Sequence, residues 1–209
     1  MLILSSNGLT SPALLEAARV QVRPWMQRAA LVTTASLSYK EQDRHVPQRL
    51  KELDALGLAA ECFDFDGSPA RSFANYDAAV FLGGNPFYLL KSLRACGAAP
   101  ILKGFLEDEK LLIGCSAGSL VMQRSIALIA RYSPELNDSV GLLDTIGLGL
   151  TDVEILPHYH RFLPRFEHFE KRAQAYERET GIPVLRIDDG QAVFLYSNGP
   201  RVEGTPLSM

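Results

Sequence analysis

Short apolar runs alternate with amphipathic segments along the first 122 residues of the chain. Each apolar run ends in turn residues, which is typical of buried strands. The predicted strands cover residues 2–5, 28–34, 58–65, 77–82 and 111–113. Apolar residues at helical spacing predict helices after Pro12 and over residues 42–56, 87–96 and 101–108. This alternation favours an α/β fold with a doubly wound, mostly parallel sheet and helices on both faces.

The pattern changes after residue 122. A loop is predicted at 131–137 and a glycine-rich apolar segment at 141–150, followed by a short strand at 153–156 and a charged helix at 164–179. Two further strand signals, at 184–187 and 192–196, flank Asp188, Asp189 and Gly190, which predicts a C-terminal hairpin at this turn. A second turn is predicted at 197–200.

Composition limits the class of protein. The 209 residues, with 47% hydrophobic and 22% charged side chains, predict one globular domain over residues 1–209. A net charge of -3 gives no reason to expect nucleic acid as a partner, and no apolar run approaches the roughly 20 residues that span a membrane. Three cysteines without CxxC spacing and an N-terminus without a basic region indicate a cytoplasmic protein with no zinc site and no signal peptide. No metal or organic cofactor is implied.

The first candidate for chemistry is the stretch Gly114-Cys115-Ser116-Ala117-Gly118, which lies between a predicted strand and a predicted helix at 119–122. G-x-S-x-G in this context is typical of a nucleophile elbow, a tight turn that holds a serine hydroxyl above the edge of a sheet. Cys115 is beside the apex of such an elbow and is expected to be a buried small residue rather than a nucleophile.

A serine nucleophile needs a general base, for which the chain offers four histidines. His45 and His168 fall in predicted amphipathic helices and are expected at the surface. His158 and His160 follow a predicted strand at a proline turn. On extended backbone these two would share one face, so either could be the base.

The base in turn needs a carboxylate to orient it. Asp188 and Asp189 are the leading candidates because they occupy a turn between two strand signals. Asp138, Asp144, Asp152 and Glu154 are weaker ones. The order serine, histidine, acid differs from the order in α/β-hydrolases, and the chain is short for that fold.

A tetrahedral intermediate also needs hydrogen-bond donors for its oxyanion. In an elbow the backbone N–H after the nucleophile, here that of Ala117, is one donor. Gly84 or Asn85, in the turn Gly83-Gly84-Asn85-Pro86, could supply the second. The alternative is a tight turn that needs glycine only for its dihedral angles.

Four segments together carry a family resemblance. Leu82–Leu90, Gly114–Gly118, Pro157-His158-Tyr159 and Ile187–Gly190 resemble the peptidase E (aspartyl dipeptidase) family of serine peptidases, to which cyanophycinase is related. The resemblance implies a class I glutamine-amidotransferase-like three-layer sandwich. It also implies that Ser116 is the nucleophile and His158 the base, with Asp189 where the family usually has glutamate.

The resemblance implies a substrate class as well. Peptidase E removes an N-terminal aspartate from dipeptides, and a basic residue after the histidine recognises the acidic side chain. That position falls near Phe169 here, while Arg161, Arg165 and Arg172 lie nearby in the sequence. Arg165, together with Tyr159 and His160, is therefore a candidate for substrate binding.

The leading hypothesis is a cytoplasmic serine exopeptidase that hydrolyses short peptides through an acyl-enzyme on Ser116. The sequence leaves open whether it forms a homodimer. A cyanophycinase-like hydrolase of β-linked aspartyl-arginine is a second hypothesis. A non-catalytic protein that binds small molecules on the same fold is a third. An amidotransferase would need cysteine at the elbow apex, so Ser116 argues against it.

Overall fold

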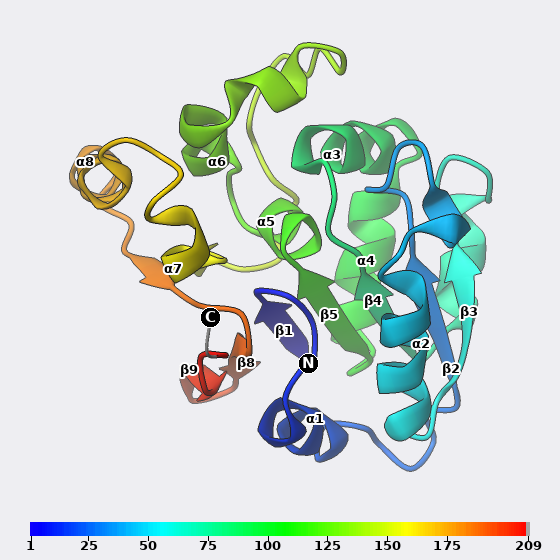
Figure 1. Cartoon of the computed structure of the whole chain (residues 1–209). Helices are drawn as coiled ribbons and strands as arrows, with labels where there is room; N and C mark the ends of the chain where they lie inside the picture. The colour runs from blue at the N-terminus through cyan, green and yellow to red at the C-terminus, as the bar shows by residue number, and fades with distance from the viewer. Residues whose placement is uncertain (208–209) are drawn as a thin grey trace.

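A central sheet organises the structure, a computed structural model that describes residues 1–207. The sheet has the strand order β3-β2-β4-β5-β1-β8-β9 (Figure 1). Its strands are β1 (Leu2–Ser5), β2 (Arg28–Val32), β3 (Ala59–Phe63), β4 (Ala78–Phe81), β5 (Leu111–Cys115), β8 (Gln191–Tyr196) and β9 (Gly199–Gly204). The first five pair in parallel, and β8 pairs antiparallel with both β1 and β9. The predicted mostly parallel sheet is thus confirmed.

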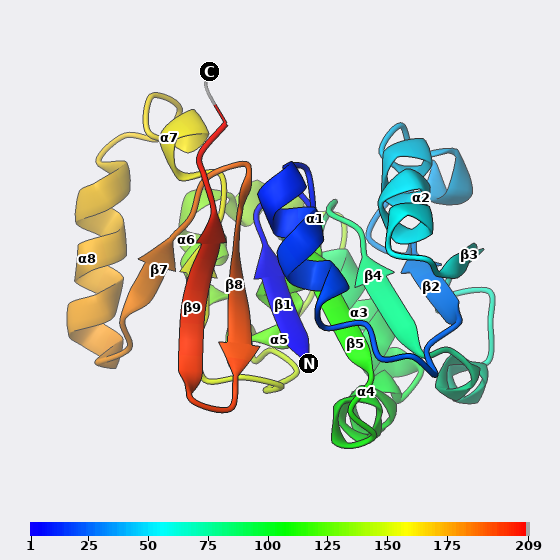
Figure 2. The ribbon, with the colours of Figure 1, turned by 90° about the horizontal axis from the view of Figure 1, so that it is seen from below.

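Helices cover both faces of this sheet (Figure 2). One face is packed by α1 (Pro12–Arg19) and α2 (Val46–Ala55), and the other by α3 (Pro86–Ala95), α4 (Ala98–Glu107) and α5 (Ala117–Met122). The apolar side chains of α1 and α2 are buried with one set of strand residues, and those of α3, α4 and α5 with the alternate set. The three-layer arrangement follows from this division, because each apolar strand contributes side chains to two separate cores.

A smaller lobe, with its own apolar core, packs at one side of the main sheet (Figure 1). It contains β6 (Glu154–Leu156) and β7 (Val184–Arg186), which pair in parallel, with α6 (Ala127–Tyr132), α7 (Tyr159–Phe162) and α8 (Phe169–Thr180). The short 3₁₀ helices are η1 (Lys40–Gln42), η2 (Ala70–Asn75) and η3 (Pro134–Asn137). The segment predicted as a loop at 131–137 therefore contains the end of α6 and the whole of η3.

The C-terminal hairpin has its turn at a different place from the one predicted. Strands β7 and β8, which flank Asp188 to Gly190, belong to different sheets and do not pair with each other. The hairpin is formed by β8 and β9, with Tyr196 opposite Gly199 across a two-residue turn. Local pattern identifies a strand but not its partner, and the partner of β7 is β6, which lies far earlier in the chain. Within residues 1–207, none of the helices is both long enough and apolar enough to cross a membrane.

Candidate active site

Ser116 lies at a strained turn between β5 and α5. Its φ of 49° is unusual for a residue with a side chain. The turn is so tight that a Cβ on Gly114 would come within 2.5 Å of the Ser119 backbone nitrogen. Glycine is required there because the helix returns directly over the strand. The local geometry is a tight strand-to-helix turn with a serine at its apex, which is the backbone arrangement that a nucleophile elbow requires.

His158 is the histidine that reaches Ser116. It follows β6 by two residues and has a left-handed backbone with φ of 59°, which begins α7. Its Nε2 lies 2.9 Å from Ser116 Oγ. The ring is buried and packs edge-on against Phe162 at 5.2 Å between centroids, an arrangement that restricts its rotation.

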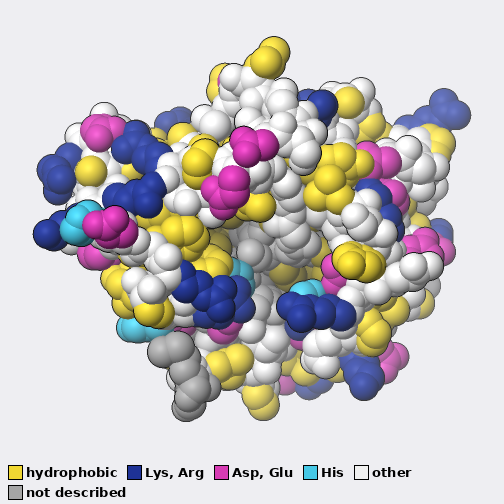
Figure 3. Space-filling model, turned by 45° about the horizontal axis from the view of Figure 1, so that its top comes forward, with side chains coloured by type: hydrophobic (Ala, Val, Ile, Leu, Met, Phe, Trp, Pro, Cys, Tyr) yellow, Lys and Arg dark blue, Asp and Glu magenta, His cyan; other side chains and the backbone are white. Residues whose placement is uncertain are grey.

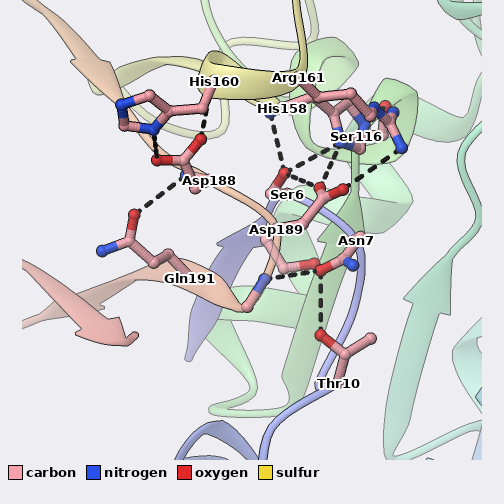
Figure 4. Close-up of polar contacts among 12 residues, drawn as sticks. Ser6, Asn7, Thr10, Ser116, His158, His160, Arg161, Asp188, Asp189 and Gln191 are labelled. Atoms are coloured by element: carbon pink, nitrogen blue, oxygen red, sulfur yellow. Dashed lines mark hydrogen bonds and ion pairs between the residues drawn. The ribbon is translucent and has the colours of Figure 1, made fainter. Parts of the chain in front are cut away.

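Asp189 lies on the other side of the His158 ring (Figure 4). Its Oδ1 is 2.5 Å from His158 Nδ1, and its Oδ2 is 3.3 Å from Arg161 Nη1. The residue is in the segment between β7 and β8, so the site is assembled from the main sheet and the smaller lobe together.

The charge state of Asp189 decides which ring nitrogen carries the proton. Burial alone would raise the pKa of Asp189, but hydrogen bonds from His158 and Ser6 and the charges of His158 and Arg161 outweigh it, so the pKa is lowered. An ionised carboxylate can only accept hydrogen bonds, so the Nδ1 of His158 must donate. In the neutral ring, Nε2 is then free to accept the proton of Ser116.

Ser6 is a member of the site that the sequence did not suggest. Its hydroxyl donates to Asp189 Oδ1 at 2.7 Å and accepts from the His158 backbone nitrogen at 2.9 Å. The strand register explains its position, because Ser5 of β1 pairs with Cys115 of β5 and the next residues are Ser6 and Ser116. A polar residue directly after a buried strand was the available signal, but it has meaning only once β1 and β5 are known to be neighbours.

His158 and His160 do not share a face, contrary to the prediction. The left-handed backbone of His158 ends the extended segment, and His160 falls within α7. The Nδ1 of His160 contacts Asp188 Oδ2 at 2.5 Å, outside the Ser116 site (Figure 4). The two neighbouring aspartates are thus divided between the two histidines. His45 and His168 precede α2 and α8 rather than lying within them, and both are exposed as expected.

The predicted oxyanion donors differ in their availability. Ala117 is the first residue of α5, so its N–H has no partner within the helix. The N–H of Gly84 has no hydrogen-bond partner among residues 1–207. Asn85 was predicted wrongly as a donor: its N–H donates to the Ala35 carbonyl at 3.0 Å, and its side chain caps α3.

Two cavities meet at Ser116 and His158. One is apolar, about 120 Å³ in volume, and continues over Ala117 toward α6, η3 and α7. The other is polar, about 350 Å³, and its lining includes the basic residues Arg44, His45, Arg49 and Arg161. In Figure 3 basic side chains stand on both sides of a hollow in the surface.

The residues predicted to bind substrate lie elsewhere. Tyr159 donates its hydroxyl to Glu170 at 2.9 Å, His160 contacts Asp188, and Arg165 is exposed beside the Phe162 ring. None of these three lines either cavity. Their sequence proximity to His158 was misleading because Tyr159 packs against the core of the smaller lobe, His160 turns to Asp188, and Arg165 follows α7 at the surface. Arg161, from the same helix, does line the polar cavity.

Cys115 is buried beneath the elbow, as expected, and burial raises the pKa of its thiol. The side chain therefore stays protonated and apolar in character. In the described part of the chain, no group of three or more His, Cys, Asp or Glu side chains is arranged to hold a metal ion.

Ser116, at the turn from strand to helix, is hydrogen-bonded to His158, and His158 is hydrogen-bonded to Asp189. This arrangement is typical of hydrolases. The sequence profile of Peptidase family S51 matches residues 1–201, and the chain belongs to this family of peptidases.

Three relatives illustrate the similarity. An uncharacterized peptidase of Pasteurella multocida is 31% identical over 58% of this chain and 57% of its own length, so this match spans little more than half of that relative. An uncharacterized peptidase of Listeria monocytogenes is 30% identical over 78% of this chain and 80% of its own. Peptidase E of Salmonella arizonae is 25% identical over 99% of this chain and 90% of its own.

The fold is also found in a solved structure. A Listeria monocytogenes EGD-e protein, provisionally named a peptidase E, superposes with a TM-score of 0.76 at 24% identity. The superposition covers 99% of this chain and 98% of the other. The fold and the family expected from the sequence motifs are both confirmed.

Proposed function

We propose that the protein is a serine exopeptidase that hydrolyses short peptides through an acyl-enzyme on Ser116. The observation that carries the proposal is the hydrogen-bonded chain from Ser116 Oγ to His158 Nε2 and from His158 Nδ1 to Asp189. A base within reach of a serine, itself oriented by a carboxylate, is the arrangement that activates a hydroxyl at neutral pH.

In the acylation step, Ser116 Oγ attacks the peptide carbonyl carbon while its proton passes to His158 Nε2. The carbonyl oxygen becomes negatively charged and accepts hydrogen bonds from the N–H groups of Ala117 and Gly84. The C–N bond then breaks, and His158 returns the proton to the departing amine. The acyl group remains as an ester on Ser116.

Water completes the cycle. His158 takes a proton from water, the resulting hydroxide attacks the ester carbonyl, and the proton returns to Ser116 as the C–O bond breaks. Asp189 stays ionised throughout and stabilises the imidazolium, in keeping with its lowered pKa. The free carboxylic acid product leaves.

Small substrates suit the dimensions of the site. Cavities of about 120 and 350 Å³ match single side chains and chain ends rather than a folded protein. The name Peptidase E carried by a relative that aligns over 99% of this chain also supports a peptide substrate.

A fluorophosphonate probe and a dipeptide library test the proposal. Wild-type protein should form one covalent adduct at Ser116 and cleave a subset of the dipeptides. Ser116→Ala should lose the adduct and, by comparison with other serine hydrolases, roughly 10⁴-fold or more of the turnover. Ser72→Ala is a matched control, because its hydroxyl only donates to the Pro69 carbonyl away from both cavities. Turnover by Ser116→Ala close to that of wild type would overturn the mechanism. No adduct and no cleavage with wild type would instead favour a binding protein.

A further inference from the structure

The two cavities that meet at Ser116 differ sharply in character, and this difference specifies a substrate. We propose that the protein cleaves peptides in which an aliphatic residue of about leucine size precedes the scissile bond and the following residue carries the free C-terminal carboxylate. The aliphatic side chain occupies the apolar cavity, and the carboxylate occupies the polar one. This inference rests on the proposed serine peptidase activity.

The apolar cavity is built to hold a hydrocarbon side chain. Among the described residues that line it, none is Asp, Glu, Lys or Arg, and its outer walls are Leu128, Ile129, Tyr132, Leu136, Phe162 and Phe166. An apolar cavity of about 150 Å³ in another protein is large enough to bind benzene. The 120 Å³ available here therefore fits a leucine or methionine side chain better than a tryptophan.

Three polar side chains of the apolar cavity already have hydrogen-bond partners. Gln123 Oε1 accepts from the Ile155 nitrogen at 3.2 Å, and Ser125 Oγ accepts from Ala127 and donates to Thr145. The Tyr132 hydroxyl donates to the Phe169 carbonyl at 2.7 Å. An apolar side chain therefore takes no partner from these three groups, whereas an aspartate side chain would be buried without a cation.

The position of the oxyanion donors identifies the apolar cavity as the acyl side. Ala117 lines the apolar cavity and not the polar one, while Gly84 lines both. The carbonyl that stays esterified to Ser116 is the one held by these donors, so the residue before the scissile bond extends into the apolar cavity. The amine product leaves through the other side.

The polar cavity carries the positive charge that a carboxylate needs. Arg49 is neutralised by an ion pair with Glu52 at 2.9 Å, and Arg161 contacts Asp189. Arg44 is exposed, and among residues 1–207 it forms no ion pair and no side-chain hydrogen bond. Arg44 is therefore the arginine available to bind a substrate carboxylate, for which its planar fork is suited.

Competition among four dipeptides and one dipeptide amide tests this assignment. We expect kcat/KM for Leu-Gly to exceed that for Ala-Gly by about 10-fold or more. A single methylene group in a hydrophobic pocket changes kcat/KM by about 10- to 200-fold. Leu-Gly should exceed Asp-Gly by a larger factor, and Asp-Leu should be a poor substrate. Leu-Gly amide, which lacks the free carboxylate, should be cleaved at least about 10-fold less efficiently than Leu-Gly.

Paired variants locate each effect. Leu136 lines the apolar cavity at 37% exposure, so Leu136→Asp should fold normally yet lose most of the preference for Leu-Gly over Ala-Gly. Leu143→Asp, at a fully exposed leucine outside both cavities, is the matched control and should keep that preference. Arg44→Ala should erase the difference between Leu-Gly and its amide, and Arg71→Ala, an exposed arginine outside both cavities, should not.

Failure of this inference is distinct from failure of the proposed function. If cleavage depends on Ser116 but Asp-Gly or Asp-Leu is preferred to Leu-Gly, the assignment of the cavities is overturned while the peptidase mechanism stands. The same holds if Leu136→Asp leaves the preference intact. If no peptide is cleaved in a Ser116-dependent way, the proposed function itself is wrong.

Discussion

The Ser6 hydroxyl donates a 2.7 Å hydrogen bond to Oδ1 of Asp189, 183 positions away in the chain. The same oxygen of Asp189 contacts His158, and Ser6 also accepts from the His158 backbone. The end of β1 is thereby tied to both the proposed base and the proposed acid. Ser6 does not touch the hydroxyl of Ser116 itself, so we regard it as a positioning residue.

Ser6→Ala should lower kcat by about 10- to 100-fold, a loss typical of misplacing a catalytic group by a fraction of an ångström to 1 Å. The fall should come mainly in kcat, because Ser6 lines neither cavity and its loss leaves KM little changed. Kinetics of peptide hydrolysis over a range of pH would measure both kcat and KM. Ser6→Thr, which keeps the hydroxyl, should recover part of the activity. A change in KM with kcat unaltered would refute the positioning role.

Asp189→Asn should be far more damaging than Asp188→Asn. An amide at 189 can donate to Nδ1 of His158 and so favour the wrong ring tautomer, which costs roughly 10⁴-fold in kcat in other serine peptidases. Asp188 contacts only His160 among the histidines, so its replacement should cost much less. Equal losses in the two variants would show that the acid is not assigned to Asp189 alone.

Ser116→Gly should yield a more stable protein than Ser116→Ala, although both should be inactive. A non-glycine residue at a sparsely populated dihedral pair costs about 1–3 kcal/mol, and glycine relieves that cost while alanine does not. With φ of 49° and ψ of -112° at Ser116, we expect the glycine variant to be more stable by about 1 kcal/mol. Urea unfolding of the two variants measures the difference directly, and a more stable alanine variant would contradict it.

Glu154→Gln should stabilise the protein at neutral pH. The carboxyl is buried, its Oε1 has no hydrogen-bond partner among residues 1–207, and burial raises its pKa against smaller opposing effects of Tyr176 and Arg124. The folded state thus binds this proton more tightly than the unfolded chain, so stability falls as pH rises from the unfolded pKa to the folded one. Glutamine has nearly the same size but carries no charge, so it avoids the cost of ionising a carboxyl that burial desolvates, and we expect a gain on the order of 1 kcal/mol.

The gain from Glu154→Gln should be present at about pH 8 and shrink toward about pH 4, where the wild-type carboxyl is itself protonated. Thermal unfolding at the two pH values would reveal it. Glu135→Gln, at an exposed carboxyl, serves as the matched control. A gain of equal size at both pH values would argue against desolvation of Glu154 as its cause.

The elements of the main sheet were predictable because their signals are local. The strand at 111–113, the turn at Ser116 and the helix that follows all come from apolar runs and glycine positions within one short stretch. The helix after Pro12 was likewise predictable, and in the structure α1 begins at Pro12 with the Ser11 hydroxyl accepting from the Leu14 nitrogen as an N-cap. These features depend on backbone sterics that act within a few residues.

Predictions failed where a residue's partner lay far away in the chain. Asn85 seemed free to bind an oxyanion, but its N–H is taken by Ala35, which precedes it by 50 positions. The hairpin predicted around Asp188 to Gly190 failed because β7 pairs with β6 instead. No local pattern could have revealed either contact.

The sequence by itself determined the alternation of strands and helices over the first 122 residues, the strand-to-helix turn at Ser116, and His158 and Asp189 as candidates for the site. Only the tertiary structure decided that β1 lies beside β5, which brings Ser6 to Asp189, and that the left-handed backbone at His158 separates this ring from His160. Only the tertiary structure also reveals that the apolar cavity and the polar cavity meet at Ser116. The reason is that dihedral preferences and periodicity act between neighbours in the chain, whereas strand partners and cavity walls depend on which distant surfaces bury each other.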